Sequence, residues 1–152
     1  MSDIEIKNKT SYHVISGRLA GERVATRILE EQVQDAVAQG HRALQIDAYG
    51  QHGIGGRLWQ AGDKPIHIRV VGQPGQRLGS MGFSNTSIEV LGPASDDVGW
   101  LNAGSEIVIH GNAGNGCANA MAQGKIFISG NIGARGMTMT KHNPRFDPPE
   151  LW

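Results

Sequence analysis

Ile68-Arg-Val-Val-Gly72, Ile88-Glu-Val-Leu-Gly92, Ile107-Val-Ile-His-Gly111 and Ile126-Phe-Ile-Ser-Gly130 are four copies of one pattern. Their closing glycines lie 20, 19 and 19 residues apart. Each is followed by a similar turn: Gly72-Gln-Pro-Gly75, Gly92-Pro-Ala-Ser95, Gly111-Asn-Ala-Gly114 and Gly130-Asn-Ile-Gly133. A weaker copy begins at Leu44-Gln-Ile46. A fixed period of this length is typical of a solenoid.

This repeat is too short to bury a hydrophobic face alone, so neighbouring copies must stack. We predict a mainly β fold over residues 43–140, a right-handed parallel β-helix of about four to five coils with about 19–20 residues in each. Each coil should hold two or three short strands, with side chains alternating between its inside and its outside. The predicted inward ladders contain Ile88, Val90, Ile107, Ile109, Ile126 and Ile128.

Glycine is the compositional outlier, at 22 of 152 residues. We expect glycines at the corners, where the chain turns sharply at positive φ or passes close to the backbone of the next coil. The predicted structural turn glycines are Gly72, Gly75, Gly92, Gly111, Gly114, Gly130 and Gly133. Three residues beyond these turns, a second inward corner is predicted at Leu78, Val98, Cys117 and Gly136.

The outward positions form two columns, of which half the residues are apolar. The first contains Arg69, Glu89, Val108 and Phe127, and the second contains Val71, Leu91, His110 and Ser129. A sheet face with so many apolar side chains should be covered, either by an N-terminal helix or by a partner protein. The candidate interface residues are Val71, Leu91, Val108, Phe127, Leu151 and Trp152.

The two ends of the chain differ from the repeats. Residues 1–42 form a lead-in with a helix predicted over residues 21–39, which begins after a start signal at Ser16 and ends at Gly40. Residues 141–152 form a tail in which Leu151 and Trp152 resemble the opening of another strand. The tail is either a shortened next coil or a cap that folds over the open end. Because an uncapped solenoid end exposes unpaired backbone groups, we expect self-association or a partner there.

Charge and composition narrow the function classes. The chain has 14 Lys plus Arg and 14 Asp plus Glu, so we expect neither nucleic acid nor a membrane as a partner. The single cysteine, the absence of a signal-like N-terminus and the lack of a long apolar run favour a cytoplasmic protein.

Catalytic and metal-binding motifs are weak. The six histidines show no paired ligand spacing, and the ladder neighbours of His110 include no carboxylate that would orient it as a general base. Cys117 is interpreted as a small buried hydrophobe, and the adjacent Asp96 and Asp97 as solvated loop residues. No phosphate-binding glycine motif is complete. An acyltransferase or a sugar-active enzyme on a β-helix is therefore the less favoured alternative.

Three stretches resemble a known family. Ile107-Val-Ile-His-Gly-Asn-Ala-Gly-Asn-Gly116, Met121-Ala-Gln-Gly-Lys-Ile-Phe-Ile-Ser-Gly-Asn-Ile-Gly133 and Gly50-Gln-His-Gly-Ile-Gly-Gly-Arg-Leu58 resemble the GXGXG domain, the C-terminal β-helix of the large (alpha) subunit of glutamate synthase. The domain is also similar to one of the subunits of formylmethanofuran dehydrogenase. The resemblance covers residues 43–140, although Ser95 replaces the second turn glycine and the fourth coil loses its regular tail.

The resemblance implies a non-catalytic assembly subunit in a complex that makes glutamate and assimilates ammonia. Its partners would be the glutaminase and the FMN and iron–sulfur subunits, and this chain would hold no cofactor or metal and no catalytic residue. The alternative complex is of the formylmethanofuran dehydrogenase type, again with this chain as a scaffold. A homo-oligomer is a further alternative.

Overall fold

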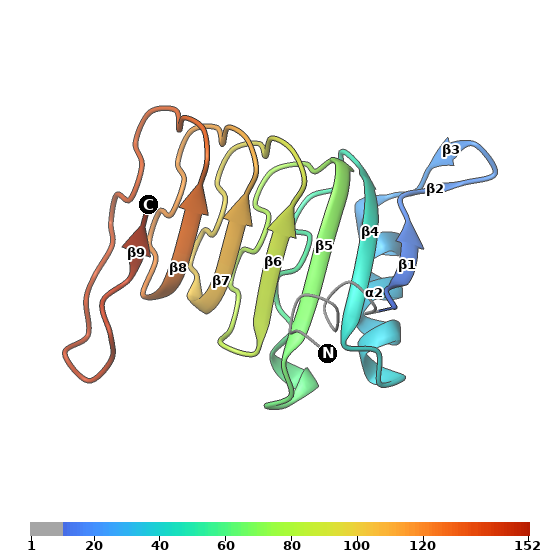
Figure 1. The fold of residues 1–152 in the computed structure, drawn as a ribbon, viewed down its shortest axis with the longest axis horizontal. Helices are drawn as coiled ribbons and strands as arrows, with labels where there is room; N and C mark the ends of the chain where they lie inside the picture. The colour runs from blue at the N-terminus through green and yellow to red at the C-terminus, as the bar shows by residue number, and fades with distance from the viewer. Residues whose placement is uncertain (1–10) are drawn as a thin grey trace, which may run out of the picture.

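The computed structural model describes residues 11–152. In this part of the chain, seven strands form one parallel sheet in the order β1-β4-β5-β6-β7-β8-β9. The strands stand side by side, and the connections return behind them (Figure 1). Their bounds are β1 His13–Ser16, β4 Ala43–Tyr49, β5 Ile66–Gln73, β6 Thr86–Val90, β7 Ala103–Ile109, β8 Gln123–Ile128 and β9 Glu150–Leu151. This arrangement is a parallel β-helix of about four turns, and the predicted fold class is confirmed.

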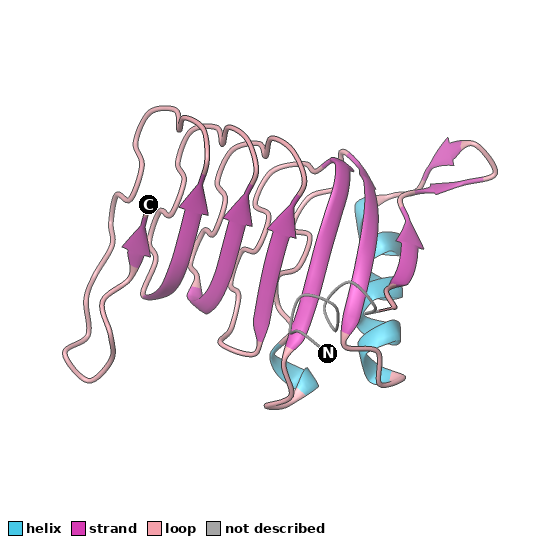
Figure 2. Ribbon diagram, viewed as in Figure 1, coloured by secondary structure: helices cyan, strands magenta, loops and turns pink. Residues whose placement is uncertain are grey.

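Each coil contributes one strand, not the two or three that its length suggested. The return side is built from turns, and Figure 2 draws it as loop. Backbone hydrogen bonds nevertheless join successive turns: Gly99 N donates to Leu78 O at 2.8 Å, and Ala118 N to Val98 O at 2.8 Å. These turns stack on one another but do not form strands, because many of their residues have positive φ and are not in the extended conformation. Arg77, Asp97 and Ala118 are examples.

The inward ladders lie in the predicted register. Leu44, Ile68, Ile88, Ile107 and Ile126 are aligned on consecutive strands. All five side chains are at most 1 % exposed. The second inward corner is also confirmed at Leu78, Val98 and Cys117, which are fully buried. The weak first copy at Leu44 is a genuine coil, but it lies 24 residues from its partner Ile68 because the 3-10 helix η1 (Trp59–Ala61) occupies the connection.

The N-terminal helix is shorter than predicted. Helix α2 spans Thr26–Ala38, and Ser16 lies at the end of β1. Between them, β2 (Arg18–Leu19) and β3 (Glu22–Arg23) form a hairpin whose turn residues Ala20 and Gly21 both have positive φ. Two successive residues with positive φ form the tight turn that matches the twist of a β-hairpin. The predicted helix therefore cannot include these residues.

The predicted end of the helix at Gly40 is confirmed. Gly40 has a φ of +99°, its N–H donates to Val37 O at 3.0 Å, and His41 N donates to Ala36 O at 3.1 Å. This pair of bonds is a Schellman motif, which satisfies carbonyls of the last helical turn.

The helix closes one end of the coil stack. Leu29, Val33, Ala36 and Val37 are buried in the same core as the inward ladders. Leu29 and Val33 line a small cavity together with Ile54 and Leu58, and Gln34 Nε2 donates to Arg57 O at 3.3 Å. α2 lies behind β1 and β4, on the side of the return loops (Figure 1). Between β1 and β4, α2 therefore occupies the position that turns occupy in the later coils. We name this end of the coil stack the head end.

Candidate functional site

The outer face of the sheet carries the two columns that the sequence predicts. Arg69 pairs with Glu89, Glu89 with Val108, and Val108 with Phe127. On the next pair of strands, β8 and β9, Ile126 is aligned with Leu151, which places Trp152 beside Phe127. Leu91 N donates to Val70 O and His110 N to Val90 O, which continues the second column past the strand ends. Side chains in one column thus repeat at the spacing of adjacent strands, roughly 4.8 Å.

The half of this face over β4–β6 is polar. The Arg69 guanidinium lies 4.2 Å from the centre of the Tyr12 ring, and its Nη2 donates to the Tyr12 hydroxyl at 3.2 Å. His67 Nδ1 lies 2.9 Å from Ser87 Oγ. Burial lowers the pKa of His67 below its ordinary value of 6.5; the nearby Glu89 carboxylate opposes this effect and Arg69 adds to it. The surroundings of His67 therefore favour the neutral imidazole.

The rest of the face, from the end of β6 to β9, carries an apolar column beside a charged one, in which Glu106, Lys125 and Glu150 are aligned and Lys125 Nζ lies 3.5 Å from Glu150 Oε2. Leu91 is 46 % exposed and Trp152 is 70 % exposed, while Val108 and Phe127 are half-buried, as is Val71 at the edge of the polar half. The predicted interface residue Leu151 does not lie on this face, because it is aligned with the inward Ile126 and packs against the core.

The prediction that the N-terminal helix covers this face is wrong, because α2 packs against the coil interior behind the sheet. Cover by a partner protein stays a prediction. We name Leu91, Val108, Phe127 and Trp152 the apolar row.

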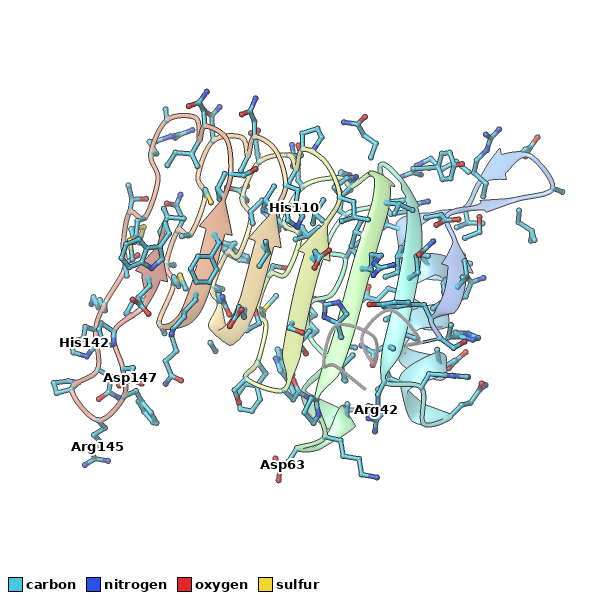
Figure 3. All side chains as sticks on the ribbon, in the orientation of Figure 1. Arg42, Asp63, His110, His142, Arg145 and Asp147 are labelled. Atoms are coloured by element: carbon cyan, nitrogen blue, oxygen red, sulfur yellow. The ribbon has the colours of Figure 1, made fainter. Side chains whose placement is uncertain are left out.

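His110 has a carboxylate neighbour that the sequence alignment did not place beside it. Its Nε2 lies 3.7 Å from Glu89 Oε1, one strand away on the diagonal, and both side chains are partly exposed. Diagonal neighbours on a sheet are within reach of long side chains, which a comparison of ladder partners alone leaves out. Figure 3 shows His110 at the end of β7, far from His142, Arg145 and Asp147 on the loop before β9.

Most of the predicted turn glycines are required by close approach and not by φ. Gly72 and Gly92 have positive φ, but Gly75, Gly111, Gly114, Gly130 and Gly133 do not. A Cβ on Gly111 would meet Pro93 N at 2.8 Å and Gly92 C at 2.9 Å, and a Cβ on Gly114 would overlap the Asp96 carboxylate. Each turn therefore rests directly on the turn below it.

Polar side chains brace these turns, and the solvated-loop interpretation of Asp96 is wrong. Asp96 Oδ1 accepts a hydrogen bond from Asn115 N at 2.7 Å, and Asn115 Oδ1 accepts one from Ala134 N at 2.7 Å. Asn112 Oδ1 likewise accepts from Asn131 N at 2.8 Å. Asp96 and Asn115 occupy equivalent positions one coil apart. The 19-residue spacing between Asp96 and Asn115 was the feature of the sequence from which this contact could have been predicted.

Other candidate chemistry is sparse in the described residues. Among residues 11–152, no three His, Cys, Asp or Glu side chains are grouped so that they could hold a metal ion. Cys117 is fully buried, as predicted, and burial raises the pKa of its thiol to about 11. No helix in this range has the length and apolar character needed to cross a bilayer.

Fold and surface together define the class: a β-solenoid repeat protein with one helix-closed end and a divided outer face. Searches with the whole chain find no matching family model, no similar curated protein and no similar solved structure.

Proposed function

We propose that the chain is a non-catalytic assembly subunit of a glutamate-synthase-like complex. In this proposal the β-helix braces separate glutaminase and FMN/iron–sulfur subunits, and the redox cofactors belong to those partners. The resemblance of the repeats to the GXGXG domain supports the choice of complex.

The exposed apolar row is the observation that carries the scaffold role. Leu91 and Trp152 are exposed on a sheet whose register is fixed by parallel pairing between successive coils, four of these pairs of strands being joined through buried residues. Exposed apolar patches mark interaction sites on soluble proteins, and large aromatic side chains such as Trp152 are enriched among the residues that anchor protein interfaces. The polar half beside it supplies the hydrogen-bonding rim that such interfaces have.

The test is purification of the tagged chain from its source cells at low salt, with identification of co-eluting subunits and an absorbance scan. We expect glutaminase and FMN/iron–sulfur chains in the eluate, with flavin and iron–sulfur bands. A chain that elutes alone and colourless contradicts the proposal. Co-elution of molybdopterin or tungsten subunits contradicts the choice of complex and favours the formylmethanofuran dehydrogenase type.

A matched pair of variants tests the surface itself. Leu91→Ser with Phe127→Ser removes two members of the apolar row, and recovery of the partner subunits should fall roughly tenfold or more. Leu19→Ser is the control, because Leu19 is 71 % exposed on the β2–β3 hairpin, away from this row. Equal loss with both variants would show that the apolar row is not the docking surface.

A further inference from the structure

Asn115 is followed by Gly116, and this is the one Asn-Gly pair in the 152-residue sequence. The backbone nitrogen that follows an asparagine can attack the side-chain amide carbon, Cγ, and expel ammonia. The reaction is fastest when glycine follows, because glycine has no Cβ to hinder the approach and its backbone is the most mobile. The Asn115 side chain is exposed to solvent, so the pair is a candidate for this chemistry.

The folded stack prevents the attack by holding both reacting groups. Gly116 N donates to Ala134 O at 2.9 Å, and Asn115 Oδ1 accepts from Ala134 N at 2.7 Å. Both contacts come from the next turn, residues 130–139. The peptide group is also held from the previous turn, because Asn115 O accepts from Asp97 N at 2.8 Å. Attack requires the amide to rotate towards a nitrogen that has lost its proton, and both changes break the contacts with Ala134.

Two further asparagines of the same coil are braced in the same way. Asn112 Oδ1 accepts from Asn131 N at 2.8 Å, and Asn119 Oδ1 accepts from Thr138 N at 2.9 Å. Alanine follows each of them, so a Cβ hinders the attack there. When the next turn lifts away, all three amides are released together, but only Asn115 has the sequence that reacts fast.

The two products of the reaction affect the stack differently. Aspartate keeps the oxygen acceptor, and Asp96, one coil earlier, shows that a carboxylate fits at this position, since its Oδ1 accepts from Asn115 N at 2.7 Å. Isoaspartate adds a methylene group to the backbone. Gly114 O accepts from Gly133 N at 3.0 Å, so a longer backbone after Gly114 moves Gly116 N out of register with the next turn.

From these contacts we infer that Asn115 is a modification site, which the turn of residues 130–139 closes and which reacts when that turn lifts. Isoaspartate at this position prevents the turn from docking again, so the modification makes a reversible opening permanent. This inference is independent of the proposed function.

The reaction needs only the chain and water. The bond between Gly116 N and Asn115 Cγ forms, the bond between Cγ and Nδ2 breaks, and the proton of the Gly116 N–H leaves with the amide nitrogen as ammonia. Water then opens the cyclic imide at one of its two carbonyls, which gives aspartate or isoaspartate.

The primary experiment incubates the whole chain at mildly alkaline pH, in buffer and in urea, and follows the peptide that contains Asn115 by mass spectrometry. Deamidation of Asn115 should be at least about tenfold slower in buffer than in urea, because the reaction waits for the turn to open. Asn112 and Asn119 should stay unmodified over the same period in both conditions. Equal rates in buffer and urea, or equal reaction at all three asparagines, would overturn the inference.

A matched pair of glycine variants tests whether this turn is the gate. A Cβ on Gly133 would overlap Asn115 Oδ1, so Gly133→Ala displaces the amide from its brace. The rate in buffer should rise about tenfold or more, while the rate in urea should not change. Gly40→Ala is the control, because nothing lies within 4 Å of its Cβ and it is at the far end of the stack; it should leave both rates within about twofold. An unchanged rate in Gly133→Ala would contradict the inference.

The wild-type chain supplies a test that needs no destabilised variant. Its isoaspartate form can be separated by chromatography and compared with Asn115→Asp, which carries the same charge on an unaltered backbone. Hydrogen exchange at residues 131–138 should be at least about tenfold faster in the isoaspartate form. Equal exchange in the two proteins would show that the modification does not detach the turn.

Discussion

At the scale of single residues, Cys117 shows how the stack removes reactivity from a nucleophilic group. The thiol fills the corner position that Leu78 and Val98 fill in earlier coils, and it is fully buried there. Burial disfavours the thiolate, which is the reactive form, and the pKa of about 11 leaves little thiolate at neutral pH.

We therefore expect Cys117 to react with a disulfide reagent at about pH 8 only when the coil opens. Labelling in buffer should be at least about a hundredfold slower than in urea, as followed by absorbance of the released thiol. The same chain unfolded in urea supplies the reference rate. Equal rates in the two conditions would show that the corner is not closed.

His67 gives the residue-scale prediction for pH. Its pKa is lowered in the folded state, so the unfolded chain binds more protons as the pH falls through the ordinary value near 6.5. The free energy of unfolding should therefore decrease from about pH 7 to about pH 5. His67→Gln, which keeps an amide near Ser87, should reduce that decrease in urea titrations. His142→Gln on the exposed tail loop is the control, and an unchanged slope in His67→Gln would contradict the prediction.

At the scale of one element, the stacked turn is specified by close contacts that leave no room for a Cβ. Gly111 sits on the backbone of Gly92 and Pro93, which cannot move without displacing the coil below. Gly40 provides a contrast, because its φ is +99° but nothing lies within 4 Å of the place that a Cβ would occupy.

Gly111→Ala should therefore destabilise the protein by roughly 3 kcal/mol or more, through overlap with backbone. Gly40→Ala should cost about 1 kcal/mol, because it places a side chain in the left-handed region without any overlap. Urea unfolding followed by circular dichroism measures both values. A larger loss for Gly40→Ala would mean that turn conformation, and not close approach, decides the glycine positions.

The elements also show which features could be predicted from the sequence. The spacing of Ile68, Ile88, Ile107 and Ile126 was sufficient for the fold, the register and the inward ladders, because every coil repeats the same constraint. The position of α2 was not, because β1 and the hairpin depend on pairing with β4 and on two left-handed turn residues. The contact between Glu89 and His110 was missed for a related reason, since it crosses the ladder diagonally.

At the scale of the whole molecule, stability should be graded along the coil stack. Each coil contacts only its neighbours, so a coil with neighbours on both sides opens less often than one at an end. The head end is closed by α2, whereas residues 130–147 are mostly exposed.

Hydrogen exchange should accordingly be slowest in β5–β7 and fastest at residues 141–147, whose side chains are exposed throughout. Mass spectrometry of peptides from the exchanged protein measures these exchange rates. Uniform protection along the chain would contradict the graded stack.

The helix at the head end also determines where coils can be inserted or deleted without loss of packing. A coil duplicated or deleted among β6, β7 and β8 would meet equivalent isoleucines above and below, since Ile88, Ile107 and Ile126 occupy the same position. A change in the connection between β4 and β5 would instead deprive α2 of the Ile54 and Leu58 surface on which it packs. Descendants of this sequence are therefore expected to vary in coil number beyond β5 and to keep their first coil unchanged in length.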